Sequence, residues 1–302
     1  MRFKSIVCAT DFSDFSNRTL PYGIAIAREF GAKLYVCHVI DLTALTMYGE
    51  FQIDPVGQQD RIRQDADVQL KTMLAPHRIE WEPLILVGQP AAEIARIVDE
   101  KGIDLVIAAT RGRSGIKRLI MGSVTQRLIR TLNCPLLAVQ SPEQGFIDPA
   151  AGAIRLKKIL IGCDFSEDSA LALSYGLSLA QEFEAEVHLV HVVEPPVYEE
   201  FMTPSEQAEK LVLTDAVTER LEALVPAEAR NWCSLKSEVL RGRPYEELVA
   251  FSMAQAIDMI VLGVRGYGLV KSLLMGSTTD RVVRNAPCPV LAVSAEAQKG
   301  LP

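Results

Sequence analysis

The sequence of 302 residues has no apolar run of the roughly 18 to 20 residues that a membrane-spanning helix needs. Its basic start, "MRFKSIVCATDFSD", reaches Asp11 after only a few apolar residues, too early for the hydrophobic region of a signal peptide. Cysteines are few, and none forms a CxxC pair; they are Cys8, Cys37, Cys134, Cys163, Cys233 and Cys288. Four of them lie in or beside strand-like apolar runs, where cysteine usually acts as a small hydrophobe. We therefore expect a soluble, cytoplasmic protein with buried, reduced thiols and no membrane partner.

The sequence also lacks an excess of positive charge. Its formal net charge is −7, whereas nucleic-acid binding normally rests on a basic face. We expect no nucleic-acid partner, so an anionic ligand would have to be held locally.

Several catalytic motifs are missing. No GxxxxGK[ST] occurs, "GYGLVK" breaks the GxGxxG spacing, and the HRD and DFG elements of kinases are absent. His188 and His191 are three residues apart on an expected strand and would point to opposite faces, so we expect no metal site. Ser123 and Ser277 have no motif-linked histidine to activate them, so we expect no dedicated catalytic activity.

What the chain does contain is a duplication. "KSIVCATDFSDFS" (residues 4–16) matches "KKILIGCDFSEDS" (residues 157–169), and residues 112–139 match residues 266–293 with 14 of 28 positions identical. Two copies of about 150 residues each predict two similar domains. The join should lie within residues 140–155, which are rich in Pro, Gly and Ala. We expect domains at 1–141 and 154–302.

Each copy alternates short apolar runs with longer helical patterns. Strands are expected near residues 5–10, 33–40, 82–88, 104–109 and 135–140, and in copy two near 158–163, 186–193, 236–242, 258–263 and 289–294. Helices are expected near 16–30, 58–74, 91–101 and 122–132, and at the equivalent positions of copy two. Continuous apolar strands separated by helices predict parallel βαβ units. The fold class is therefore α/β, with two tandem doubly wound, Rossmann-like domains, each a five-stranded parallel sheet with helices on both faces.

In such sheets, ligands bind beyond the carboxyl ends of the strands, where the strand order reverses. The run "GVRGYGLVKSLLMGSTTDR" (residues 263–281) begins at such a strand end. Gly276 and Ser277 open a helix whose N–H groups could bind an anion, with hydroxyls of Ser277, Thr278 and Thr279 as further donors. Gly263 and Gly266 would allow positive φ or close approach of a ligand. Alternatively, these residues serve only as a helix cap and turns.

One aspartate follows the first strand of each copy. Asp11 and Asp164 are each followed by Phe-Ser. Either carboxylate could accept hydrogen bonds from a ribose, or "DFS" could be the N-cap of the following helix. An anion site facing a carboxylate across a switch point favours a nucleotide as the ligand.

The combined pattern resembles the universal stress protein family, as a tandem pair covering almost the whole chain. The residues that carry the resemblance are Gly263-x2-Gly266-x9-Gly276-Ser277, "DFS" after the first strand, "HV" at the end of the second and "CPVLAV" at the close. The resemblance implies ATP as ligand, with AMP and ADP as alternatives and Mg²⁺ on the phosphates. It also implies an internal pseudo-dimer of the two domains, with a further homodimer as an additional possibility.

The resemblance also assigns binding residues. In copy two the glycines and the Ser/Thr after them would hold phosphates and ribose, the aspartate the ribose and the valine the adenine; these are Asp164, Val192, Gly263, Gly266, Gly276, Ser277 and Thr278. Copy one offers Asp11, Val39, Gly112, Gly122 and Ser123. Ala109 stands where the family's first glycine belongs. If that glycine takes positive φ, Ala109 is strained, and copy one should bind more weakly.

Two functions remain open at this point. The first is a cytoplasmic ATP-binding regulatory protein of the stress response, with at most slow ATP hydrolysis. The second is a stress-related scaffold that binds a protein partner or an apolar ligand and uses the glycine loops only as structure. An adenylyl-transferring enzyme would need a catalytic motif that we do not find. Nucleotide released from purified protein on denaturation would separate the first two.

Overall fold

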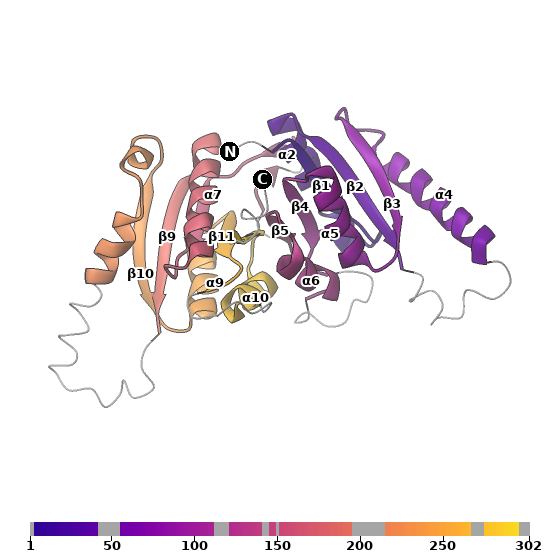
Figure 1. Cartoon of the computed structure of the whole chain (residues 1–302). Helices are drawn as coiled ribbons and strands as arrows, with labels where there is room; N and C mark the ends of the chain where they lie inside the picture. The colour runs from indigo at the N-terminus through magenta and orange to yellow at the C-terminus, as the bar shows by residue number, and fades with distance from the viewer. Residues whose placement is uncertain are drawn as a thin grey trace. The chain divides into compact units, whose positions relative to one another are not determined.

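The computed structural model describes residues 3–41, 55–111, 121–140, 145–148, 151–194, 215–266 and 275–295. Its contacts divide the chain into two compact units. One unit contains the residues up to 140 together with the short strands β6 (Ile147–Asp148) and β7 (Ala153–Ile154). The other contains Phe146 and residues 155–295. Each unit contains its own strands and helices (Figure 1).

The first unit is built around five parallel strands. Their order is β5-β4-β1-β2-β3, and every neighbouring pair is parallel. The strands are β1 (Ser5–Ala9), β2 (Lys33–Ile40), β3 (Trp81–Val87), β4 (Leu105–Ala109) and β5 (Leu136–Val139). The helices are α1 (Asp14–Asn17), α2 (Leu20–Phe30), α4 (Pro55–Leu74), α5 (Pro90–Lys101) and α6 (Ser123–Thr131).

The second unit repeats this plan. Its strand order is β12-β11-β8-β9-β10, again parallel throughout. The strands are β8 (Lys158–Gly162), β9 (Glu186–Val193), β10 (Leu235–Arg241), β11 (Met259–Gly263) and β12 (Val290–Val293). The helices are α7 (Glu167–Phe183), a helix over residues 215–223, the 3₁₀ turn η2 (Ala227–Asn231), α9 (Pro244–Ala254) and α10 (Ser277–Asn285).

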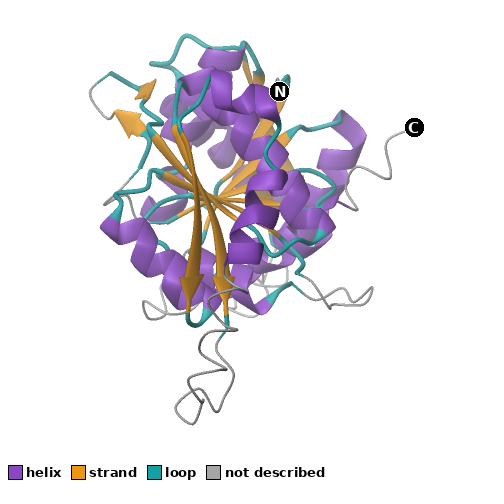
Figure 2. Ribbon diagram, turned by 90° about the vertical axis from the view of Figure 1, so that its left-hand side faces the viewer, coloured by secondary structure: helices purple, strands orange, loops and turns teal. Residues whose placement is uncertain are grey.

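Helices cover both faces of each sheet (Figure 2). In the first unit α5 packs against α6, while α2 packs on β1 and β2. In the second unit α9 packs against α10, while α7 packs across β8, β9 and β11. This two-sided cover follows from right-handed crossovers that run one way from the first strand and then the other way. The predicted doubly wound α/β class is confirmed for both copies.

The central strands are apolar on both faces because both faces are covered. Ile6, Leu105 and Ile107 in the first unit, and Ile159 and Leu160 in the second, are at most 1% exposed. Burial of such a side chain contributes roughly 1.5 to 3 kcal/mol each. All ten strands lie within one or two residues of the predicted ranges.

One predicted helix is divided in the structure. The expected helix over 16–30 is instead α1, ending at Asn17, and α2, beginning at Leu20. Pro21 supplies no N–H for a bond to the preceding turn, so the helix cannot run through this point. The equivalent α7 has Ser174 in that place and continues unbroken for 17 residues.

The join between the copies contains regular structure that the sequence did not predict. β6 and β7 form a two-residue antiparallel hairpin, and both strands contact α2. The hairpin therefore extends the first unit beyond the end of its sheet.

Candidate functional site

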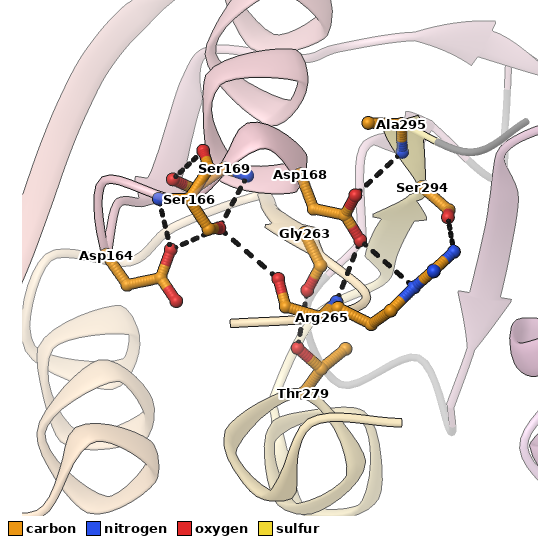
Figure 3. Close-up of polar contacts among 9 residues, drawn as sticks. All are labelled: Asp164, Ser166, Asp168, Ser169, Gly263, Arg265, Thr279, Ser294 and Ala295. Atoms are coloured by element: carbon orange, nitrogen blue, oxygen red, sulfur yellow. Dashed lines mark hydrogen bonds and ion pairs between the residues drawn. The ribbon is translucent and has the colours of Figure 1, made fainter. Parts of the chain in front are cut away.

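The first strand of copy two ends in a tight polar turn. Oδ1 of Asp164 accepts hydrogen bonds from the backbone N–H of Ser166 at 3.1 Å and from its hydroxyl at 2.5 Å. Ser166, not Asp164, is the N-cap of α7: its Oγ accepts from the N–H of Ser169 at 3.2 Å. The alternative that "DFS" caps the following helix is therefore confirmed through its serine, and the carboxylate of Asp164 holds that serine in place (Figure 3).

Copy one repeats this turn. Oδ1 of Asp11 accepts from the N–H of Ser13 at 3.0 Å and from its hydroxyl at 2.5 Å. Ser13 caps α1 through the N–H of Ser16. The two copies thus present their aspartates in the same way at the end of the first strand.

The phenylalanine between each aspartate and serine was not predicted to matter. Phe12 and Phe165 have φ of 63° and 64°, in the left-handed region that costs an ordinary residue roughly 1 to 2 kcal/mol. Each ring lies against a histidine at the end of the second strand, with centroids 4.4 Å apart for Phe12 and His38 and 4.8 Å for Phe165 and His191. The repeated "DFS" and "HV" are the sequence signal for this pairing.

These histidines also tie the first two strands of each copy together. Nδ1 of His191 lies 2.7 Å from the carbonyl oxygen of Cys163, and Nδ1 of His38 lies 2.9 Å from that of Thr10. A carbonyl oxygen can only accept, so Nδ1 carries the hydrogen in both rings. Each histidine therefore fixes the strand end directly before the aspartate.

Gly263, the last residue of β11, and Gly266, in the loop after it, do not take positive φ. The positive-φ glycines of the described residues are Gly31, Gly88, Gly102, Gly152 and Gly242, so that interpretation of Gly263 and Gly266 is wrong. Close approach of the protein's own atoms, not of a ligand, is what the structure shows at both glycines. A Cβ on Gly266 would lie 2.6 Å from Oδ2 of Asp164, and one on Gly263 would lie 2.7 Å from the backbone carbonyl carbon of Asp168. The carboxylate of Asp164 therefore lies next to the backbone of Gly266.

The expected strain at Ala109 is absent for the same reason. Ala109 is the last residue of β4 and is not among the described residues with positive φ. Alanine in place of the family's first glycine can therefore affect binding only through the space that its methyl group fills, and not through backbone strain.

A glycine begins the last helix of each copy. Gly276 is the N-cap of α10 with φ −59° and ψ 138°, and Gly122 is the N-cap of α6 with nearly the same angles. Without a capping side chain, the N–H groups of the first helical turn face outward. Thr279 does not add a hydroxyl to this array, because its Oγ1 donates to the carbonyl oxygen of Gly263 at 2.7 Å. In copy one, Oγ1 of Thr125 likewise donates to the carbonyl oxygen of Ala109 at 2.6 Å.

A crevice of about 570 Å³ lies at this end of the copy-two sheet. Its volume falls within the range of roughly 300 to 1,000 Å³ that is typical of small-molecule sites. All seven residues predicted for copy two line it: Asp164, Val192, Gly263, Gly266, Gly276, Ser277 and Thr278. His191, Glu194, Arg265 and Met275 also line it and were not predicted. The crevice lies between the ends of β8 and β11, where the strand order reverses.

Copy one has a corresponding crevice of about 360 Å³. Asp11, Val39, Gly122 and Ser123 line it, together with Ala109 and Arg111. The predicted residue Gly112 lies outside the described residues. The structure therefore brings together four of the five residues predicted here.

Other predicted features can be located as well. His188 is 1% exposed, with Nδ1 2.9 Å from Oε1 of Glu238, whereas His191 lies at the crevice. Within the ranges that the structure describes, no group of three or more His, Cys, Asp or Glu side chains could hold a metal ion. No helix in the described part of the chain is both long and apolar enough to cross a bilayer.

The cysteines are mostly buried. Cys8, Cys37, Cys163 and Cys288 are buried, and Cys134 and Cys233 are half-buried. Burial raises the pKa of the Cys8 and Cys37 thiols to about 12. At neutral pH these side chains are protonated and act as small hydrophobes.

Fold and site together define a tandem doubly wound α/β protein with one crevice at the strand ends of each copy. The model of the universal stress protein family matches residues 2–140 and again residues 155–294. The chain therefore belongs to the universal stress protein family and carries its domain twice.

Individual relatives agree with this assignment. A universal stress protein of Synechocystis sp. is 22% identical over 95% of this chain and 99% of its own length. One of Methanocaldococcus jannaschii is 32% identical over 145 residues, which are 47% of this chain and 85% of that protein. The crystal structure of a universal stress protein from Archaeoglobus fulgidus matches with a TM-score of 0.70 at 19% identity, over 97% of this chain and 99% of that one. The last likeness shows the shared fold.

Proposed function

We propose that this chain is a cytoplasmic ATP-binding universal stress protein, a regulatory nucleotide binder of the stress response. The observation that carries the proposal is the meeting of all seven predicted residues of copy two in one crevice. A carboxylate, a glycine-lined loop and a helix N-terminus there offer an acceptor for ribose and donors for phosphate.

In this proposal the ligand lies along the strand ends. Adenine contacts Val192 at the end of β9, and the ribose hydroxyls donate to Asp164. The phosphates lie over Gly263 and Gly266 and accept from the first turn of α10. Mg²⁺ would be held mainly by phosphate oxygens, since the described residues offer no cluster of metal ligands. Residues 1–141 and 154–302 act as the two nucleotide-binding domains.

The pairing of the two copies is a separate part of the proposal. β5 is the end strand of the first unit's order and β12 that of the second, and both are apolar. An end strand presents backbone groups that can pair with another strand. We propose that these edges form the internal pseudo-dimer that the family resemblance implies.

The test is to identify the small molecule that purified protein releases on denaturation, by mass spectrometry, and to titrate stripped protein with ATP, ADP and AMP, with and without Mg²⁺. Saturable binding of an adenine nucleotide, with at most slow phosphate release, supports the proposal. A protein that carries no nucleotide and binds none would instead favour the scaffold function.

A further inference from the structure

Asp168 holds together the segments around the copy-two crevice. It lies in the first turn of α7 and is 7% exposed. Oδ2 accepts from the backbone N–H of Arg265 at 2.9 Å, and Oδ1 accepts from that of Ala295 at 2.8 Å. One buried carboxylate thus joins α7 to the loop after β11 and to Ala295, two residues beyond the end of β12 (Figure 3).

The side chain of Arg265 strengthens this arrangement. Its Nε lies 3.8 Å from Oδ2 of Asp168, and a terminal nitrogen donates to Oγ of Ser294 at 2.6 Å. The guanidinium thereby balances part of the charge of the buried carboxylate. The glycine-rich loop is held at Arg265 through both its backbone and its side chain.

The same turn of α7 fills the space beside Gly263. A Cβ on Gly263 would lie 2.7 Å from the carbonyl carbon and Cβ of Asp168 and 2.8 Å from the N of Ser169. These neighbours are mainly backbone atoms, which cannot move aside cheaply. Gly263 therefore allows α7 to approach closely enough for Asp168 to reach the loop.

Copy one lacks both halves of this contact. Phe15 stands at the position of Asp168, and Ala109 at that of Gly263. A phenyl ring cannot accept hydrogen bonds from two N–H groups. In addition, copy one has α1 and α2 where copy two has the unbroken α7.

We propose that Asp168 is a positioning residue that holds residues 264–266 in the nucleotide-binding conformation, and that this makes copy two the tighter site. The inference rests on the proposed nucleotide-binding function. A loop already fixed in its bound conformation loses little conformational entropy when the phosphates arrive. Copy one has no carboxylate at this position and must order its loop by other means.

The decisive variant is Asp168→Asn. Asparagine has almost the same shape but only one acceptor oxygen, and its NH₂ group would face one of the two N–H donors. Asp258→Asn is the matched control, because Oδ2 of Asp258 accepts from the N–H groups of Lys157 and Lys158 at 2.8 and 2.9 Å, next to the start of β11 and away from the crevice. Both variants lose a carboxylate that holds two backbone N–H groups.

Calorimetric titrations of full-length protein with ATP and with adenosine provide the readout. Asp168→Asn should weaken ATP binding at the dominant site at least tenfold, or about 1.4 kcal/mol, with a much smaller effect on adenosine, which has no phosphates. Asp258→Asn should lower the melting temperature and leave ATP affinity unchanged. Unchanged ATP affinity in Asp168→Asn, or an equal loss for ATP and adenosine, would overturn the inference.

Hydrogen exchange in the wild-type protein gives a test that needs no variant. The amides of Arg265 and Ala295 should already be protected before nucleotide is added, and rapid exchange of both in nucleotide-free protein would also overturn the inference. Failure of the proposed function is distinguishable, because wild-type protein would then bind no nucleotide at all.

Discussion

The hydroxyl of Thr279 donates a hydrogen bond to the carbonyl oxygen of Gly263 at 2.7 Å, joining the first turn of α10 to the last residue of β11. Thr125 and Ala109 form the same bond at 2.6 Å in copy one. The two motif segments of each copy are therefore linked side chain to backbone, beneath the surface where a ligand would lie. This link gives the first prediction.

Replacing Thr279 with valine should lower the stability of copy two by roughly 0.5 to 1.5 kcal/mol, because a partly buried carbonyl group loses its hydrogen bond. Valine matches threonine in shape, so packing is kept. Chemical denaturation of Thr279→Val should show this loss, and Thr125→Val should show a similar one. If the variant is as stable as wild type, another donor satisfies the carbonyl group.

The second prediction concerns the helix cap. A side chain at Gly276 would begin 3.2 Å from the carbonyl oxygen of Val264 and 3.7 Å from the N of Gly266. Gly276→Val therefore crowds the loop and covers the helix N-terminus, and ATP affinity should fall at least tenfold, or about 1.4 kcal/mol.

The control for Gly276→Val is Gly122→Val, whose nearest neighbour is the carbonyl oxygen of Thr110 at 3.4 Å. It should leave the dominant site intact. A melting temperature that drops in Gly276→Val while ATP affinity holds would show that the glycine serves only the fold.

The third prediction separates the two oxygens of Asp164. Asparagine keeps an acceptor for the N–H of Ser166 but places an NH₂ group beside Gly266, where Oδ2 now lies. Asp164→Asn should therefore weaken ATP binding about tenfold or more with little loss of stability. Asp164→Ala should lower both the ATP affinity and the stability.

Dideoxy-ATP sharpens the test of Asp164, because it has no ribose hydroxyl to donate. Its affinity should change far less than that of ATP when Asp164 becomes asparagine. Equal losses for both nucleotides would contradict a ribose role for the carboxylate.

The fourth prediction concerns alkaline pH. Burial raises the pKa of the Cys8 thiol from its ordinary value near 9.0 to about 12. Above pH 9 the unfolded chain therefore releases a proton that the folded protein retains, and stability falls as pH rises from about 9 to 12. The contribution is complete below pH 9.

The slope of unfolding free energy against pH measures this effect. Between pH 9.5 and 10.5, Cys8→Ala should have a flatter slope than wild type, by up to about 1.4 kcal/mol per pH unit. The half-buried Cys233, changed to alanine, should alter the slope less. An unchanged slope in Cys8→Ala would mean that this thiol titrates normally in the folded state.

Most of the fold could be predicted from the sequence because apolar runs and helical periods are local signals. Each signal also occurs in both copies of the duplicated sequence. The seven copy-two residues could be predicted to lie together because the motif and the family resemblance place them at strand ends and at a helix start, and they line one crevice. Asp168 could not, since an acidic residue in the first turn of a helix is usually explained by the helix dipole alone. Its partners, Arg265 and Ala295, lie 97 and 127 residues away. The backbone of Gly263 was misinterpreted for a similar reason, because the neighbour that excludes a side chain comes from another element.

The left-handed phenylalanines have a consequence for the unfolded chain. Glycine at position 165 would fit the φ of 64° without strain, but it would lose the ring that lies against His191. It would also give the unfolded chain more conformations to lose on folding. Phenylalanine raises the energy of the folded turn through its backbone strain. Glycine would instead increase the conformational entropy that the chain loses when it folds. Both residues can therefore adopt the positive φ at this position. Only phenylalanine leaves His191, beside the crevice, with an aromatic neighbour.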